Sequence, residues 1–386
     1  MAQFAGGRIE AFVGPTELGA NDDLESVIVD FVGGADKTLD VAVQELSSEP
    51  IAQALIDARA RGVSVNMVLE QDYLLSVDGP RTLTPAPGET AEDAAKRAQW
   101  TEEASDERVA TSRRILAAML RNGIDVRADY NKFIFHQKFV VRDYRGRATP
   151  TSALLTGSAN FTQTDCHTNL NHIVVFHDVR IASQYAGEFA QLRAGQFGRL
   201  QHGDTPSTYN LDGVPVRVLF APDHAPELEI MKQMLKAEHR IDFAVFTFAG
   251  SSGIDDAMLV VAAAGRTVRG VLDPGQGAQA WAATRWLAGK PNIELLVPKR
   301  IRGFRKLHHK LMVIDDHTVV AGSMNYTAPA NLVNDENIFV IGSPYADLPA
   351  REGGPVDLAK CAEITRYFRT EIDRIASVSD PYRPPT

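Results

Sequence analysis

Two groups of histidine, lysine and aspartate with the same internal spacing are the residues of this sequence best suited to chemistry. Each follows the pattern H-x-K-x4-D, and each is followed by G-S-x-N, which adds a glycine, a hydroxyl and an amide. Two such copies in one chain are very unlikely to arise by chance. The residues are His136, Lys138, Asp143, Gly157, Ser158 and Asn160 in the first copy, and His308, Lys310, Asp315, Gly322, Ser323 and Asn325 in the second.

These side chains suit chemistry at a phosphate group. An imidazole can act as nucleophile or as general acid and base, an ammonium group supplies positive charge, and an amide donates hydrogen bonds to phosphate oxygens. The residues around both motifs are typical of strands, in which side chains two apart share one face. Each histidine should therefore project beside its lysine. The next apolar segment should return as a hairpin and deliver G-S-x-N to the pair, where the glycine would allow close backbone approach to a ligand.

An internal repeat supplies the elements that must position these groups. Residues 37–70 and 239–273 both contain a short apolar strand, a loop, an amphipathic helix, a glycine turn and a second strand. Asp40 aligns with Asp242 and His136 with His308, so the offset between the copies falls from 202 to 172. The fall indicates an insertion in the first copy. Strands that alternate with helices predict a mainly parallel sheet covered by helices.

With both motifs and the repeat, the sequence resembles the phospholipase D superfamily over nearly its whole length. The resemblance implies an α/β fold with two lobes related by a pseudo-twofold axis, each a mixed, mainly parallel sheet flanked by helices. We expect the lobes at residues 1–203 and 213–380, with a linker at His202–Gly213. The insertion, at about residues 73–107, could be a lid, a substrate-selecting loop or a tolerated surface excursion.

The resemblance also implies a composite site between the lobes and a two-step mechanism without metal or cofactor. One histidine attacks phosphorus and forms a phosphohistidine. The other protonates the leaving alcohol and then activates water or an acceptor alcohol. The residues carried over are the histidine pair His136 and His308, with His136 favoured as nucleophile, and the phosphate ligands Lys138, Lys310, Asn160 and Asn325. A single chain would hold the whole site, so a monomer would suffice.

The two copies differ at a position that commonly orients a catalytic histidine in this family. The second copy has Glu336 where the first has Asn171. A carboxylate on an imidazole Nδ1–H fixes the tautomer and supports positive charge, whereas an amide fixes orientation only. The two histidines should therefore be inequivalent, and either of them could be the partner of Glu336. Further supporting residues are expected at Asp143, Asp315, Ser158 and Ser323.

The substrate class is suggested by local charge more than by composition. The chain has 386 residues, of which 44% are apolar and 23% charged, and a net charge of −9, which argues against a protein that coats nucleic acid generally. Its densest cationic stretch, residues 298–310, nevertheless runs into the second motif. A polyanion could use these charges to position its backbone. Candidate substrate-binding residues are Arg302, Arg305 and Lys306, with stacking surface at Phe304 and Tyr130.

Three functions fit these features. The leading hypothesis is a nuclease that hydrolyses phosphodiester bonds of DNA or RNA. The second is a phospholipase D that hydrolyses or transphosphatidylates phospholipids, which would need an interfacial apolar surface that could lie in the insertion. The third is a catalytically weak, nucleic-acid-binding relative.

The remaining sequence signals predict a cytoplasmic protein without integral membrane contact. The first residues lack the basic and apolar regions of a signal peptide, and no apolar run approaches the roughly 18 residues of a membrane helix. Two cysteines are too few for a disulfide framework in a chain of this length. A zinc site at His309, or at Cys166, His167 and His172, is not expected, because the spacing matches no zinc template.

Overall fold

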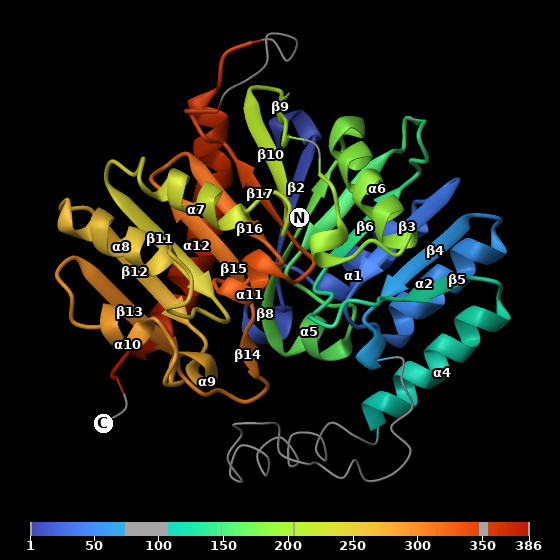
Figure 1. The fold of residues 1–386 in the computed structure, drawn as a ribbon, viewed down its shortest axis with the longest axis horizontal. Helices are drawn as coiled ribbons and strands as arrows, with labels where there is room; N and C mark the ends of the chain where they lie inside the picture. The colour runs from blue at the N-terminus through green and yellow to red at the C-terminus, as the bar shows by residue number, and fades with distance from the viewer. Residues whose placement is uncertain (1, 74–106, 148, 204, 347–353, 385–386) are drawn as a thin grey trace.

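The computed structural model describes residues 2–73, 107–147, 149–203, 205–346 and 354–384, which form two mixed sheets with helices on both sides (Figure 1). The first sheet contains, in spatial order, β1 (Ala2–Phe4), β2 (Ile9–Gly14), β8 (Asn169–Phe176), β7 (Ala153–Gly157), β6 (Lys138–Arg142), β3 (Thr38–Val43), β4 (Ser64–Leu69) and β5 (Asp125–Ala128). The second contains β18 (Ser379–Pro381), β13 (Ile293–Pro298), β12 (Thr267–Leu272), β11 (Arg240–Val245), β15 (Lys310–Ile314), β16 (Thr318–Gly322), β17 (Glu336–Ile341), β10 (Val214–Ala221) and β9 (Thr208–Leu211). A short strand of the second lobe, β14 (Lys306–Leu307), pairs with β8 of the first sheet.

The strand order confirms the repeat. The path β2-β8-β7-β6-β3-β4-β5 in the first sheet matches β10-β17-β16-β15-β11-β12-β13 in the second. The α/β class and the mixed sheets are as expected, but the expectation of mainly parallel pairing is wrong. Among the described strands, β3–β4–β5, β11–β12–β13 and β14–β8 are parallel, and the other neighbours are antiparallel. The reason is that each motif-bearing strand, β6 or β15, returns directly as the neighbouring strand, β7 or β16, in a hairpin, whereas parallel neighbours need a long crossover.

Helices cover the outer faces of both sheets and fill the space between them. The outer helices are α1 (Leu24–Gly33), α2 (Glu49–Ala60) and α4 (Glu107–Arg121) on the first sheet, and α7 (Pro226–Met234) and α8 (Ile254–Ala263) on the second. The inner helices are α6 (Val179–Arg193) and α12 (Leu358–Ser377). Short helices complete the set: α5 (Gln163–His167), α9 (Pro274–Gly277), α10 (Thr284–Leu287) and α11 (Ala328–Leu332).

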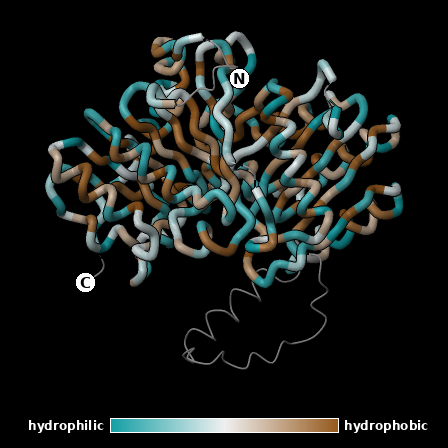
Figure 2. Tube along the Cα trace, turned by 45° about the horizontal axis from the view of Figure 1, so that its top comes forward, coloured by the Kyte–Doolittle hydropathy of each residue, from teal (hydrophilic) through white to brown (hydrophobic). Residues whose placement is uncertain are grey.

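Helix α12 illustrates how local sequence produces this packing. The side chain of Asp357 accepts hydrogen bonds from the first backbone N–H groups and so caps the helix. Its buried apolar residues recur every three or four positions, which places them on one stripe: Cys361, Ile364, Phe368, Ile372 and Ile375. This stripe joins a central core that contains inner-face residues of both sheets. Figure 2 shows hydrophobic residues along the strands through the middle of the molecule. The lobes therefore share one core.

The connection between the two lobes is shorter than the sequence indicated. Residues 208–211, inside the expected linker, form β9 and pair with β10, so the second sheet begins before Gly213. Residues 74–106 lie outside the described residues, and most of the expected insertion falls there. Cys166 and Cys361 are buried and free. None of the helices that the structure describes is both long enough and apolar enough to cross a membrane.

Two buried polar pairs at equivalent positions join the lobes. In one, Asn337 Nδ2 donates to Gln137 Oε1 at 2.7 Å. In the other, the Nδ1 atoms of His309 and His172 lie 3.1 Å apart and the rings stack with centroids 5.4 Å apart. All four side chains are fully buried. Burial lowers the pKa of both His172 and His309, because a charged imidazole is poorly solvated there.

Replacing the histidine pair by a copy of the amide pair, as His309→Gln with His172→Asn, is expected to make the protein less sensitive to acid. A histidine whose pKa is lowered on folding stabilises the protein fully above the unfolded value of about 6.5, and this contribution is lost as the pH falls below it. The difference in unfolding free energy, variant minus parent, should therefore be more favourable to the variant at pH 5.5 than at pH 8, by roughly 1–3 kcal/mol. Urea unfolding at both pH values measures this, and parallel pH curves for the two proteins would contradict it.

Candidate active site

His136 lies just before β6 and is held by a residue of the other lobe. Its Nδ1 is 2.6 Å from Oε2 of Glu336, the first residue of β17, and its backbone N–H donates to the carbonyl of Asp335 at 3.0 Å. Ser323 Oγ donates to the same Glu336 oxygen at 2.7 Å. Only 7% of His136 and none of Glu336 is exposed. The partner of Glu336, which was open from sequence, is therefore the histidine of the opposite copy.

His308 has the reciprocal arrangement. Its Nδ1 lies 3.0 Å from Oδ1 of Asn171 on β8, and its backbone N–H donates to Leu170 of the first lobe at 2.9 Å. Asn171 uses its Nδ2 to donate to a backbone carbonyl, so its oxygen faces the imidazole. Ser158 Oγ donates to that oxygen at 2.7 Å, as Ser323 does to Glu336. His308 must then carry its proton on Nδ1 when neutral, and its Nε2 is left to react.

Glycines 157 and 322 act differently from the expectation. A Cβ added at Gly157 would collide with the carbonyl oxygen of His172, and one at Gly322 with that of Asn337. The close approach that needs glycine is therefore to the neighbouring strand and not to a ligand. It allows each serine of G-S-x-N to reach the partner of a histidine.

The two lysines are buried beside the histidines. Each is 1% exposed, and its Nζ donates to the carbonyl of the histidine two residues earlier, at 2.8 Å in both lobes. Burial lowers the pKa of Lys138 to about 8. The pKa of Lys310 falls well below its ordinary value, first through burial and then through the charge of Lys138. Because an opposite charge favours the ammonium form, a bound phosphate would counter both shifts.

Asn160 shares a hydrogen-bond acceptor with Lys138, and the repeat adds a pair of positions that sequence reasoning missed. Gln44 Oε1 accepts hydrogen bonds from Lys138 Nζ and Asn160 Nδ2, both at 3.4 Å. In the second lobe, Asn325 Oδ1 accepts from the backbone of Thr247, and the residue equivalent to Gln44 is an aromatic ring. The offset of 202 that aligns the crossover strands would have identified this pair from sequence.

That aromatic ring is Phe246, and two lysine side chains make cation–π contacts with it. Lys310 Nζ lies 5.3 Å and Lys306 Nζ 5.2 Å from its centroid, and the His308 ring contacts it edge-on at 4.9 Å. Lys306 thus contacts the same ring as His308 and Lys310, whereas Arg302 and Arg305 are exposed on the preceding loop. The other two stacking candidates differ: Phe304 packs partly buried against the central core, and Tyr130 is 81% exposed.

Asp165 is a second functional candidate that sequence reasoning missed. Its Oδ2 accepts from the backbone N–H of Asn160 at 2.7 Å and lies 3.8 Å from His308 Nδ1. The equivalent position of the second copy is Ala330. His308 therefore also has a carboxylate nearby, but at a greater distance than the direct contact of His136 with Glu336. The inequivalence of the histidines is smaller than Asn171 alone suggested.

Two further carboxyl groups position the histidine segments. Glu70 Oε2 accepts from the backbone N–H of Phe135 at 2.7 Å, and Asp273 Oδ2 accepts from that of Leu307 at 3.0 Å. Burial raises the pKa of Glu70 to about 7 and raises that of Asp273 as well. The two residues align in the repeat, but no sequence signal gave them a role.

Asp143 and Asp315 stabilise turns away from the histidines. Asp315 accepts hydrogen bonds from three consecutive backbone N–H groups, residues 238–240, at 2.7–2.8 Å, and Asp143 does the same for residues 36–38. Both have positive φ, 56° at Asp143 and 48° at Asp315.

Asp315→Ala is therefore expected to lower the free energy of unfolding by about 2–4 kcal/mol, since it removes charge-assisted bonds and places alanine in the left-handed region. Asp315→Asn, which tolerates that φ and keeps one acceptor, should cost less. Urea unfolding measures the loss. A reduced rate per folded molecule in either variant would contradict a purely structural role.

The residues weighed as zinc ligands have other partners. His309 faces His172, as described above, and its Nε2 lies 3.5 Å from Glu371. His167 Nδ1 lies 2.7 Å from Glu17. Burial raises the pKa of the Cys166 thiol well above its ordinary value, so it stays protonated at neutral pH.

Both motifs lie in a region of the chain that is similar to known proteins. A family model described as "Cardiolipin synthase, PLD-like domain" matches residues 28–193 and 230–352, which include both motifs. A mitochondrial cardiolipin hydrolase of Xenopus laevis is 25% identical over 177 residues, which are 46% of this chain and 60% of that relative. The match thus spans less than two thirds of the relative's length.

One solved structure shares the fold over nearly the whole chain. Phosphatidylserine synthase of Haemophilus influenzae Rd KW20 has a TM-score of 0.57 at 11% identity, covering 99% of this chain and 88% of that one. At this identity the likeness shows the fold alone. The phospholipase D family member Nuc from Salmonella typhimurium has a TM-score of 0.37 at 20% identity, covering 44% of this chain and 99% of that one.

Proposed function

The chain belongs to the phospholipase D superfamily, and we propose that it is a metal-independent phosphodiesterase that works through a phosphohistidine intermediate. One observation carries the proposal. Each lobe contributes a histidine whose Nδ1 is held by a residue of the other lobe, Glu336 for His136 and Asn171 for His308. This arrangement leaves both Nε2 atoms for a substrate beside two buried lysines.

In the first step, Nε2 of His136 attacks phosphorus while the bond to the leaving oxygen breaks. His308, which enters this step protonated on both ring nitrogens, gives its Nε2 proton to that oxygen and becomes neutral. The lysines and asparagines of the two motifs stabilise the charge on the phosphoryl oxygens. In the second step, His308 takes a proton from water, the water oxygen attacks phosphorus, and the P–N bond to His136 breaks. Glu336 suits His136 to the nucleophilic role, because a direct carboxylate contact supports the positive charge that attack creates on the imidazole.

We further propose nucleic acid as the substrate class. Arg302 and Arg305 are exposed, and Lys306 lies over the same ring as Lys310, so positive charge extends from the surface to the proposed phosphate site. Such a strip would hold successive phosphates of a polynucleotide.

A phospholipid substrate is the second candidate, and it too has an observation in its favour. The segment just before His136 exposes large apolar side chains: Tyr130 at 81%, Phe133 at 41% and Ile134 at 48%. A patch of this kind could enter a lipid interface. The family model and the Xenopus laevis relative also carry the names of lipid enzymes.

The test offers purified protein single- and double-stranded DNA, RNA, phosphatidylcholine vesicles and cardiolipin vesicles, all in EDTA. We expect nucleic-acid cleavage that Arg302→Gln with Arg305→Gln weakens and makes less dependent on salt. The matched control, Phe133→Ser with Ile134→Ser, should leave that cleavage unchanged. If the protein turns over vesicles and no nucleic acid, and if Phe133→Ser with Ile134→Ser abolishes that turnover, the lipid candidate is established instead. Loss of every activity in EDTA would contradict the mechanism, and inactivity with tight DNA binding would indicate a binding protein.

A further inference from the structure

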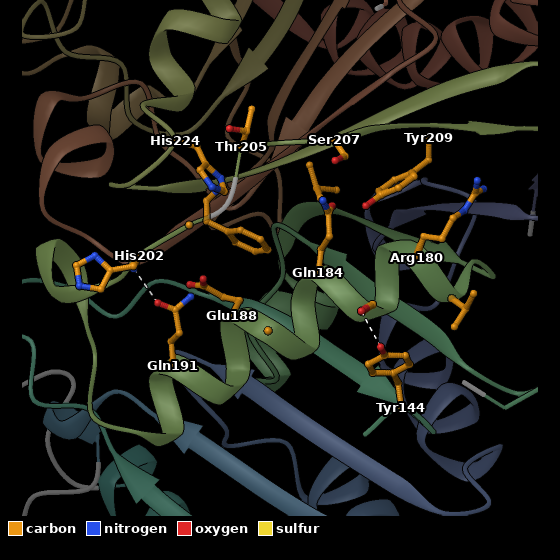
Figure 3. A pocket seen from close by; sticks show the side chains of 16 residues that line it. Tyr144, Arg180, Gln184, Glu188, Gln191, His202, Thr205, Ser207, Tyr209 and His224 are labelled. Carbon is orange, nitrogen blue, oxygen red and sulfur yellow. Dashed lines mark hydrogen bonds between the residues drawn. The ribbon is translucent and has the colours of Figure 1, made fainter. Parts of the chain in front are cut away.

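A cavity of about 690 Å³ lies between α6 and the β9–β10 hairpin, in a part of the molecule that the proposed reaction does not use. Figure 3 shows side chains of α6, among them Gln184 and Glu188, facing Tyr209 of β9 and His224, which follows β10. Phe220 and Tyr144 add two further aromatic rings to the wall. A volume of this size is typical of small-molecule sites.

Glu188 is the most deeply buried charged residue of the wall, with 3% of its surface exposed. One carboxyl oxygen, Oε1, accepts hydrogen bonds from Gln201 Nε2 at 2.8 Å and Gln137 Nε2 at 3.3 Å. Within the described part of the chain, the second oxygen has no hydrogen-bond partner. Figure 3 shows the carboxyl group extending from α6 toward the side of the cavity where His202 and His224 lie. Because buried polar atoms are usually hydrogen-bonded, a carboxyl oxygen without a partner beside a cavity indicates room for a ligand that supplies one.

The field around Glu188 favours a positively charged ligand. Burial raises its pKa well above the ordinary value, and the charges of Asp223 and Asp335 raise it further. An ammonium group would act in the opposite direction, because an opposite charge stabilises the carboxylate. The carboxyl proton would leave to solvent as the ammonium group takes its place.

The arginine of the wall is held by a carboxylate of its own helix cap. Arg180 pairs with Asp178 at 2.7 Å, Asp178 also pairs with Arg8, and the Arg180 guanidinium lies 5.1 Å from the centre of the Tyr209 ring. His202 and His224 are the imidazoles of the wall. The aromatic rings offer favourable surface to an organic cation.

A buried polar chain leads from Glu188 to the catalytic strands. Gln137, which donates to Glu188, follows His136 directly and accepts from Asn337 at 2.7 Å. Asn337 in turn follows Glu336, the partner of His136. Gln137 and Asn337 are fully buried. A change in the charge of the Glu188 carboxyl group can therefore act through these hydrogen bonds on His136 and Glu336.

We propose that this cavity binds a small organic amine through an ion pair with Glu188, and that binding is relayed to His136 through Gln137. The site is separate from the proposed phosphate site, and its occupancy can be measured without turnover.

The binding test is calorimetry of the full chain with benzylamine and with benzyl alcohol, which has nearly the same shape without the charge. Benzylamine should bind at least tenfold more tightly. Glu188→Gln should weaken benzylamine about ten- to hundredfold and remove the difference between the two probes. Gly187→Phe should block both, because Gly187 lines the cavity and an added Cβ meets nothing within 4 Å. Equal binding of the two probes would overturn the proposal, whether or not Glu188→Gln folds.

Ala190→Phe is the matched control, since Ala190 is exposed on the same helix and does not line the cavity. Ala190→Phe should leave benzylamine binding unchanged. If Gly187→Phe also leaves it unchanged, the amine binds elsewhere and the proposed site is wrong. For the relay, saturating benzylamine should shift the ¹⁵N resonances of the His136 imidazole in the parent and in Ala190→Phe but not in Gly187→Phe. Saturation without any shift at His136 would overturn the relay.

Discussion

His136→Ala is expected to reduce phosphodiester turnover by at least about 10⁴-fold, because it removes the proposed nucleophile and with it the proposed covalent route. The fold should survive, since the His136 side chain contributes one hydrogen bond, to Glu336. The measurement is the steady-state rate on a substrate that the parent cleaves, with thermal unfolding of both proteins as the check on folding. Parent-like turnover would remove His136 from the mechanism.

His308→Ala should behave differently with an activated substrate, and this difference separates nucleophile from acid. A p-nitrophenyl leaving group needs little protonation, so the first step should proceed and release a burst of about one equivalent of p-nitrophenol. The second step should stall, because no base activates water, and the phosphohistidine should accumulate. His136→Ala should give no burst. A burst from His136→Ala and none from His308→Ala would reverse the two assignments.

Glu336→Gln is expected to lower the rate by about 10²–10⁴-fold and to change its dependence on pH. Burial lowers the pKa of His136 and raises that of Glu336 to about 8, so below pH 8 the pair holds an additional proton in the free protein. That proton must leave before His136 can attack, and kcat/KM should therefore rise with pH up to about 8. It should fall at higher pH as Lys138, whose pKa is also about 8, loses its charge.

The rising limb belongs to the carboxyl group, so Glu336→Gln should abolish it and leave the falling limb. The pH profile of kcat/KM between pH 5.5 and 10 measures both. Asn171→Ala is the matched control at the equivalent position: it removes a neutral partner from His308 and should cost about tenfold without loss of the rising limb. An unchanged profile in Glu336→Gln would contradict the shared-proton account.

Much of this site could be predicted from the sequence, because it depends on local rules. Alternation along a strand places His136 beside Lys138, and the repeat places the same pair in the second lobe. The contrast between Glu336 and Asn171 was also visible from the aligned copies. Asp143 and Asp315 were expected as supporting residues, and their hydrogen bonds to consecutive backbone N–H groups give them a structural role.

What only the tertiary structure decided is which residues meet across the lobes. Glu336 reaches a histidine 200 positions away, and Asn171 reaches one 137 positions away. No local pattern encodes such crosswise contacts, because they depend on how two sheets bury their inner faces in one shared core. The same holds for Asp165, which lies on a short helix near His308 and lacks a counterpart in the second copy, and for the largely antiparallel pairing of the sheets. The sequence by itself thus determined the candidate reacting groups, and the packing of the lobes determined the residues that hold them.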